Sequence, residues 1–174
     1  LRLNFDHIDL IADKCDIIGF NYYYSQKAGP IAALTANSHR GKNFTMMGWD
    51  IDPAGLYKQI RRVGKRYGKP MMITENGIAT SDDNQRKQYI DEHVAAIQQA
   101  RADGHDVRGY FVWSLLDNYE WHGGFTDTFG LGKMNPATYA RELKPSAFHY
   151  RDIIRRGGVK QIPASVMQAS GRRR

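Results

Sequence analysis

Carboxylate and aromatic side chains follow apolar segments of this chain at positions where they could act on a polar substrate. Met71, Met72 and Ile73 run directly toward Glu75, and Gly77 ends the run two residues later. A continuous apolar run is typical of a parallel strand covered on both faces. A carboxylate at the end of such a strand is poorly placed for packing and well placed for chemistry. This run alone is equally compatible with a structural role for Glu75 in a salt bridge or cap.

Two further apolar segments end in similar side chains. Residues 16–24 contain Asn21 and Tyr23, and residues 108–116 contain Trp113, with Glu120 in the loop that follows. Because parallel strands place their carboxyl ends on one edge of a sheet, we expect these groups to converge. Carboxylate pairs with aromatic rings are typical of glycoside hydrolases. Aromatic residues that only close the edge of the core are the structural alternative.

The apolar periodicity predicts an α/β fold in which helices alternate with strands, and therefore a parallel sheet with right-handed crossovers. Helices are predicted at 5–14, from Asp52-Pro53 to Gly68, from Asp82 to Gly104, and at 146–156. The strands are 16–24, the run that carries Glu75, and 108–116, with long loops at 25–48 and 117–132.

The chain has 174 residues, 41% hydrophobic and 25% charged, as in an ordinary globular domain. Its net charge of +7 is concentrated after Asp152, where six basic residues and no acid give +6. The remaining +1 argues against a basic nucleic-acid surface on the folded part. We therefore expect residues 159–174 to form a basic, flexible tail and expect no nucleic-acid partner. Nucleic-acid binding through that tail is a further alternative.

Several classes of site are missing from the sequence. It has no glycine-rich phosphate loop, no Gly-x-Ser-x-Gly elbow and no metal-ligand spacing of His or Cys, so no cofactor or metal is expected. No apolar run is long enough for a membrane helix. Cys15 lies in an apolar context and is expected to be a buried, inert thiol. A cytoplasmic location is expected, although Leu1 is no initiator methionine and an upstream leader stays open.

Three motifs resemble those of family 1 glycoside hydrolases, the β-glucosidase and β-galactosidase family. Residues 74–77 (Thr-Glu-Asn-Gly) resemble its nucleophile motif, and residues 113–121 resemble its sugar-binding signature after the eighth barrel strand. Asn21-Tyr22-Tyr23 resembles its Asn-x-Tyr motif, and Gly48-Trp49-Asp50 matches a connecting segment. The similarity covers about residues 5–157. It implies that residues 1–158 are the last three βα units, strands 6–8, of a (β/α)8 TIM barrel.

The resemblance also implies roles for individual side chains. Glu75 would be the nucleophile of a retaining β-glycosidase and would form a glycosyl-enzyme intermediate, while Tyr23 would orient it. Asn76 and Asp117 would shape loops. The implied substrate-binding residues are Asn21, Trp113 as the platform under the sugar, Glu120 as acceptor for O4 and O6 hydroxyls, Trp121 as donor to O3, and Phe129. The family often has Arg where Thr128 precedes Phe129-Gly130, which leaves the preferred sugar open.

One half of the catalytic pair is missing. The family's acid/base glutamate lies in an Asn-Glu-Pro motif at the fourth strand, and this sequence contains no Asn-Glu-Pro. A complete barrel of this type needs about 250 residues. We therefore expect a companion chain that carries barrel strands 1–5, with a β-glycoside or oligosaccharide as substrate. A non-catalytic carbohydrate-binding fragment or pseudoenzyme is the alternative.

Overall fold

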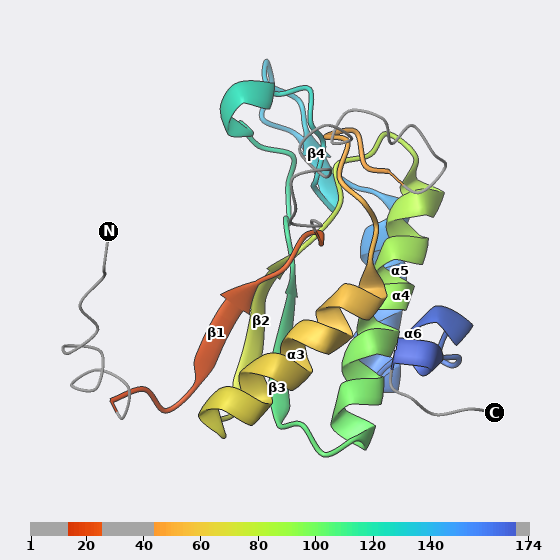
Figure 1. Cartoon of the computed structure of the whole chain (residues 1–174). Coiled ribbons are helices and arrows are strands. Elements are labelled where there is room, and N and C mark those ends of the chain that lie inside the picture. Colours follow the sequence, from red (N-terminus) through yellow and green to blue (C-terminus); the bar gives the residue numbers. More distant parts are fainter. Residues whose placement is uncertain (1–13, 26–43, 170–174) are drawn as a thin grey trace, which may run out of the picture.

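The computed structural model describes residues 14–25 and 44–169, so the helix predicted at 5–14 and most of the loop at 25–48 lie outside the described residues. It contains a parallel sheet in the order β1-β2-β3, formed by β1 (Ile18–Asn21), β2 (Met71–Asn76) and β3 (Val107–Val112). Helix α3 (Pro53–Tyr67) connects the first two strands and α4 (Asp83–Ala102) connects the second and third. From β1 to α4 and β3, the predicted order of strands and helices is confirmed. Figure 1 shows that the helices lie along one face of the sheet.

The predicted helix ends are also found. The Asp52 side chain accepts a hydrogen bond from the backbone N–H of Gly55, and Pro53 occupies the first turn of α3. Gly68 ends this helix with φ at 60°, a left-handed conformation that glycine adopts without strain. The Asp82 side chain caps α4 by accepting from the N–H of Asn84.

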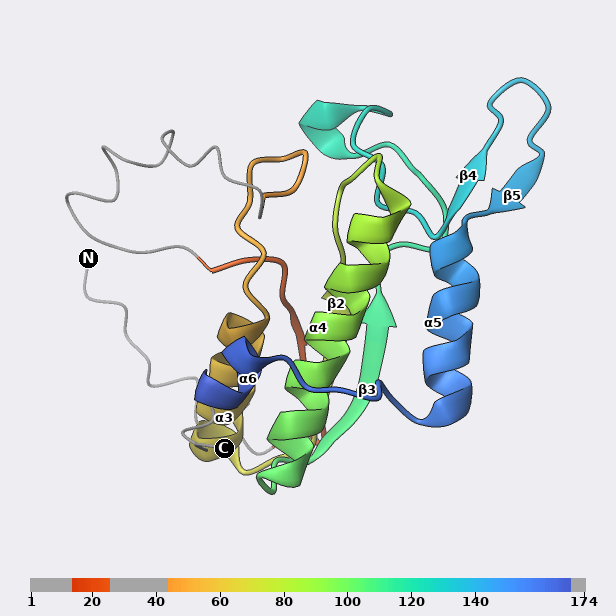
Figure 2. The ribbon, with the colours of Figure 1, turned by 90° about the vertical axis from the view of Figure 1, so that its right-hand side faces the viewer.

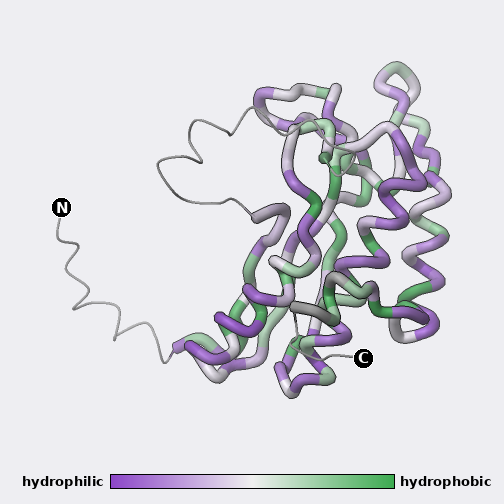
Figure 3. The backbone as a smooth tube through the Cα atoms, turned by 45° about the vertical axis from the view of Figure 1, so that its right-hand side comes forward, coloured by the Kyte–Doolittle hydropathy of each residue, from purple (hydrophilic) through white to green (hydrophobic). Residues whose placement is uncertain are grey.

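The core lies between the sheet and its helices. Leu56 and Ile60 of α3 pack with Met71 and Ile73 of β2, and all four side chains are almost completely buried. A smaller cluster joins α4 to α5 (Pro145–Arg156) and includes Ile153. Hydrophobic and hydrophilic residues alternate along the helices, as the green and purple turns in Figure 3 show, which is the pattern of amphipathic helices packed on a core.

The C-terminal third differs from the sequence prediction in two ways. Strands β4 (Gly132–Met134) and β5 (Arg141–Leu143) form an antiparallel hairpin where no strands were predicted. Residues 159–169 do not form the expected loose tail, because helix α6 (Ala164–Ala169) packs on α3 and α4, as Figure 2 shows. Val166 is fully buried in that contact, whereas residues 170–174 lie outside the described part.

Cys15 also differs from its prediction. Its side chain is half-buried instead of buried, and its Sγ lies 2.6 Å from the carbonyl oxygen of Ile17. The predicted packing of this thiol in the core is wrong because the residue precedes β1 and lies at the margin of the sheet. In the part of the chain that the structure describes, no helix is long and apolar enough to cross a membrane.

Candidate active site

A bulge in β2 determines where Glu75 points. Phe20 of β1 pairs with Ile73, but the next residue of β1 pairs with Glu75, so Thr74 is an additional residue in β2. The pairing of β2 with β3 shifts at the same place. Ile73 is buried on the helix-covered face, and the next buried position on that face is Asn76 instead of Glu75. The bulge therefore places the amide in the core and leaves the carboxylate half-buried at the pocket.

A pocket of about 520 Å³ lies beyond the carboxyl ends of the strands. Asn21 is not among its lining residues, and its role in substrate binding stays a prediction. The Asn21 side chain is exposed on β1, and its Oδ1 accepts a 2.6 Å hydrogen bond from the hydroxyl of Thr74. Asn21 lies on the open face of the sheet because residues alternate along β1. The lining residues are Tyr23, Met47, Trp49, Glu75, Trp113, Glu120, Trp121, His122, Gly123 and Phe129. Six of the seven predicted site residues are thus brought together, and their individual roles stay predictions.

The hydroxyl of Tyr23 donates a hydrogen bond to Oε2 of Glu75 at 2.7 Å. Burial raises the pKa of Tyr23 far above its ordinary value, and the hydrogen bond to Glu75 and the negative charges of Glu75 and Glu120 raise it further. The tyrosine is therefore a neutral donor throughout the physiological range. It can therefore hold the Glu75 carboxylate in one orientation by donating a hydrogen bond, without adding a charge of its own.

Trp113 is held against the end of β2. Its backbone N–H donates to the carbonyl oxygen of Asn76 at 2.9 Å. A Cβ atom added at Gly77 would lie 1.9 Å from the carbonyl oxygen of Trp113, so only glycine allows the two segments to approach this closely. The peptide bond between Trp113 and Ser114 is cis. The glycine of the Thr-Glu-Asn-Gly motif thus sets the position of the indole that lines the pocket.

Sequence reasoning missed the aromatic residue Trp49, which also lines this pocket. The Trp49 ring lies 5.7 Å from the Tyr23 ring, 6.3 Å from that of Phe129, and is stacked on Tyr24 at 4.9 Å. Trp49 belongs to a turn over residues 44–50, within which the N–H of Thr45 donates to the Trp49 carbonyl oxygen. The only signal in the sequence was the Gly48-Trp49-Asp50 match, which gave no position in space.

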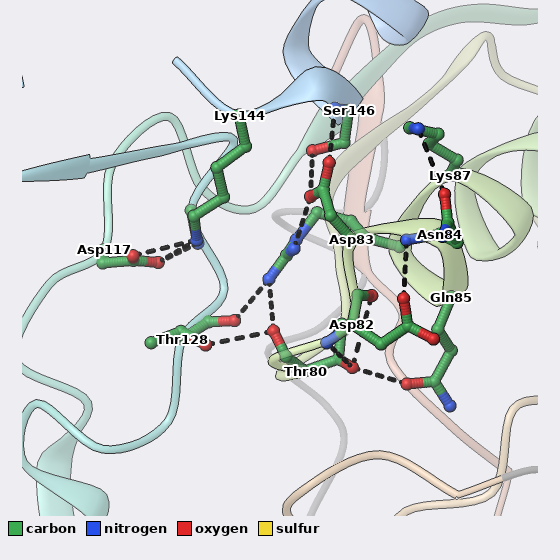
Figure 4. Close-up of polar contacts among 12 residues, drawn as sticks. Thr80, Asp82, Asp83, Asn84, Gln85, Lys87, Asp117, Thr128, Lys144 and Ser146 are labelled. Atoms are coloured by element: carbon green, nitrogen blue, oxygen red, sulfur yellow. Dashed lines mark hydrogen bonds and ion pairs between the residues drawn. The ribbon is translucent and has the colours of Figure 1, made fainter. Parts of the chain in front are cut away.

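A buried arginine ties the Phe129 loop to the start of α4. Arg86 is only 2% exposed; it donates to Oδ1 of Asp83 at 2.8 Å and to the carbonyl oxygens of Thr80 and Thr128 at 2.7 and 2.8 Å. Asp83 in turn accepts from the N–H and the hydroxyl of Ser146. Figure 4 shows Asp83 and Ser146 in contact beside the Thr80–Thr128 pair. This network fixes Thr128 and so places its neighbour Phe129 in the pocket.

A second polar contact anchors the loop that carries Glu120 and Trp121. The ammonium of Lys144 lies 2.9 Å from the carboxylate of Asp117, which also accepts from the N–H of Gly130. Both partners are mostly buried, as expected for an ion pair that joins two loop ends. Among the described residues, no group of three His, Cys, Asp or Glu side chains could hold a metal ion.

The model of glycosyl hydrolase family 1 matches residues 1–159. The chain belongs to glycosyl hydrolase family 1. Among curated members, a β-galactosidase of Sulfolobus acidocaldarius is 44% identical over 87% of this chain and 33% of its own length. β-Glucosidase A of Thermotoga maritima is 34% identical over 89% of this chain and 38% of its own length.

Solved structures of family 1 members confirm the fold. A family 1 β-glucosidase from Thermotoga maritima superposes with a TM-score of 0.79 at 32% identity, covering 92% of this chain and 39% of that one. A β-glycosidase from Pyrococcus horikoshii gives a TM-score of 0.72 at 36% identity, covering 91% and 38%. The chain therefore corresponds to part of a family 1 TIM barrel and spans 33 to 38% of the length of the two curated relatives.

Proposed function

We propose that this chain contributes the nucleophile half of a retaining β-glycosidase that hydrolyses terminal β-D-glycosides. The observation that carries the proposal is the placement of Glu75 in a pocket walled by tryptophans, with the Tyr23 hydroxyl 2.7 Å from its carboxylate. Indole rings match the apolar faces of a sugar, and a carboxylate held by one neutral donor keeps a free oxygen for attack. The printed names of the relatives, β-glucosidase and β-galactosidase, indicate this substrate class.

In the proposed reaction, Glu75 attacks the anomeric carbon and the bond to the leaving oxygen breaks as that oxygen receives a proton. A glycosyl ester forms on Glu75, and water then releases the sugar with net retention of configuration. Tyr23 orients the carboxylate in both steps. Trp113 supports the ring, and Glu120 and Trp121 bind its hydroxyls.

The proton must come from a second carboxyl group. Within the part of the chain that the structure describes, Glu120 is the only other carboxylate lining the pocket, and its proposed role is to bind sugar hydroxyls. We therefore infer a companion polypeptide that carries barrel strands 1–5 and the acid/base glutamate. The coverage of 33 to 38% of the two relatives leaves length for those strands.

Exposed apolar side chains indicate where a companion would bind. Phe111 on β3 is 54% exposed, and Phe148 and Ile154 on α5 are 46% and 60% exposed. In the described sheet, β1 and β3 each pair on one side only. An unpaired strand edge next to exposed apolar rings favours the addition of further βα units.

The test is complementation. The purified chain is mixed with the N-terminal portion of the Sulfolobus acidocaldarius relative that precedes the matched region, and hydrolysis of an aryl β-glucoside and an aryl β-galactoside is measured. We expect activity only in the mixture, and none when the chain carries Glu75→Gln. Equal activity of the chain alone would contradict the companion, and activity that survives Glu75→Gln would contradict the nucleophile.

A carbohydrate-binding fragment is the second candidate, because the aromatic pocket is present while the described pocket lacks an acid/base partner. A 2-deoxy-2-fluoroglycoside with a good leaving group separates the two. Covalent labelling of Glu75 in the complemented protein supports the enzyme. Sugar binding without labelling supports the binding fragment.

A further inference from the structure

A buried polar cluster below the pocket connects α4 to both members of the Tyr23–Glu75 pair. Asn76 is completely buried, and its side-chain amide donates to the carbonyl oxygen of Tyr22 at 2.7 Å and to the hydroxyl of Tyr89 at 2.9 Å. Its Oδ1 accepts from the hydroxyl of Tyr110 at 2.8 Å. All the hydrogen-bonding capacity of the two amide hydrogens is therefore used within the protein.

Tyr89 extends the cluster to the residue that orients Glu75. Its hydroxyl accepts from Asn76 and donates to the carbonyl oxygen of Tyr23 at 3.2 Å. Its ring is 1% exposed and lies stacked on His93, with 3.9 Å between ring centres. Burial raises the pKa of Tyr89 well above its ordinary value, so the hydroxyl keeps its proton and continues to donate.

The same cluster holds the backbone next to Glu75 by hydrogen bonds. The N–H of Tyr22 donates to the carbonyl oxygen of Glu75 at 2.9 Å, and Asn76 is the residue that follows Glu75. One hydroxyl on α4 thus contacts the segment carrying Tyr23 and, through the amide, the segment carrying Glu75. Neither Tyr89 nor Asn76 lines the pocket.

We propose that Tyr89 is a positioning residue for the Tyr23–Glu75 pair, acting through its hydrogen bonds to Asn76 and to the Tyr23 carbonyl oxygen. This inference rests on the proposed function only for its effect on the rate. The positioning itself is a property of this chain and can be measured without substrate. Loss of the Tyr89 hydroxyl leaves the Tyr23 carbonyl and one amide hydrogen of Asn76 without a partner, and the phenol of Tyr23 then shifts relative to the carboxylate.

The first measurement is a spectrum of the chain itself. The full chain is labelled with carbon-13 at Cζ of tyrosine, and the Tyr23 signal is assigned with Tyr23→Phe. Glu75→Gln shows how this signal moves when the hydrogen bond to the carboxylate is changed. In Tyr89→Phe, which keeps the ring on His93, we expect the Tyr23 signal to move in the same direction.

The matched control is Tyr150→Phe. Tyr150 also donates to the backbone carbonyl oxygen of a strand residue, that of Tyr110 at 3.1 Å, but it contacts neither segment that carries the pair. We expect this variant to leave the Tyr23 signal in place. A Tyr23 signal in Tyr89→Phe that matches the wild type would overturn the proposal. If Tyr89→Phe does not fold, Tyr110→Phe tests the route through Asn76, because it removes the hydrogen bond to Asn76 Oδ1. A Tyr23 signal that stays in place in Tyr110→Phe would then overturn positioning through Asn76.

The second measurement is kinetic and uses the complemented protein. For Tyr89→Phe we expect kcat to fall about tenfold with KM within about twofold, because a misplaced nucleophile slows attack more than it weakens binding. An unchanged kcat would contradict the proposal even if the signal moves. If the complemented wild type shows no hydrolysis, the proposed function fails, and the carbon-13 spectra still decide whether Tyr89 positions Tyr23.

Discussion

His93 gives a prediction that depends only on the folding of this chain. The imidazole is fully buried, its Nδ1 donates to the carbonyl oxygen of Tyr89 at 2.8 Å, and its Nε2 has no hydrogen-bond partner among the described residues. Burial lowers the pKa of His93 from 6.5 to about 4, while the contact with Tyr89 and the charge of Asp52 oppose this shift. The folded chain therefore holds a neutral histidine in a place where a proton is disfavoured.

The direction in which stability changes with pH follows from proton binding at His93 in the folded and unfolded chain. Between about pH 4 and 6.5 the unfolded chain binds a proton at His93 and the folded chain does not, so the free energy of unfolding falls as the pH is lowered. This contribution is fully present above pH 6.5 and is lost as the pH falls toward 4. A shift of this size corresponds to a loss of roughly 2 kcal/mol between pH 7 and pH 4.5.

The assay is urea unfolding of the purified chain, followed by far-UV circular dichroism at several pH values from 4.5 to 7. Burial alone would raise the pKa of Asp83, but hydrogen bonds from Ser146 and Arg86 and the charge of Arg86 outweigh it, so its contribution is lost only at lower pH. We expect His93→Gln to remove most of the dependence of the unfolding free energy on pH between 4.5 and 7. The control is His149→Gln, which replaces a half-buried histidine on α5. This variant should keep the pH dependence of the wild type. A slope that is equal in His93→Gln and wild type would refute the neutral, buried histidine.

Three further predictions concern the pocket and the packing of the C-terminal elements. In Gly77→Ala, the added Cβ would lie 1.9 Å from the Trp113 carbonyl oxygen, so Trp113 should move away by about 1 Å. We expect kcat of the complemented protein to fall by about 100-fold, and unchanged kinetics would contradict this packing. Lys144→Met should lower the free energy of unfolding by about 2 kcal/mol, measured in urea, because the Asp117 carboxylate loses its charged partner. Val166→Asp should cost about 3 kcal/mol in the same assay, whereas a free tail would tolerate it.

The regular elements were predictable because their signals are local. The Asp52-Pro53 start and the Gly68 end of α3 depend on capping and backbone conformation, which the sequence states directly. The helical period of its apolar residues then predicted the buried face. The hairpin β4–β5 was missed because its strands have three residues each and are too short for an alternating pattern.

Most of the pocket could be predicted because strand ends and family motifs mark it. Trp49 was missed since its place depends on a turn that packs against residues distant in sequence. The hydrogen bond of Asn21 to Thr74 could not be predicted, since the Asn-x-Tyr motif does not state which way the Asn21 side chain points. Helix α6 was missed for a similar reason. It has only six residues, too few to show a helical period, and only its contacts with α3 and α4 make Val166 a core residue.

The bulge at Thr74 makes the identity of the nucleophile a matter of strand phase. If β2 kept Thr74 but paired regularly through it, without the bulge, Glu75 would fall in phase with Ile73. The carboxylate would then turn toward the helix-covered face and the Asn76 amide toward the pocket. A strand paired in that way would carry every motif residue and still present the wrong group to a sugar. The pairing of Thr74, and not the motif residues alone, therefore decides whether this strand presents a carboxylate or an amide to the pocket.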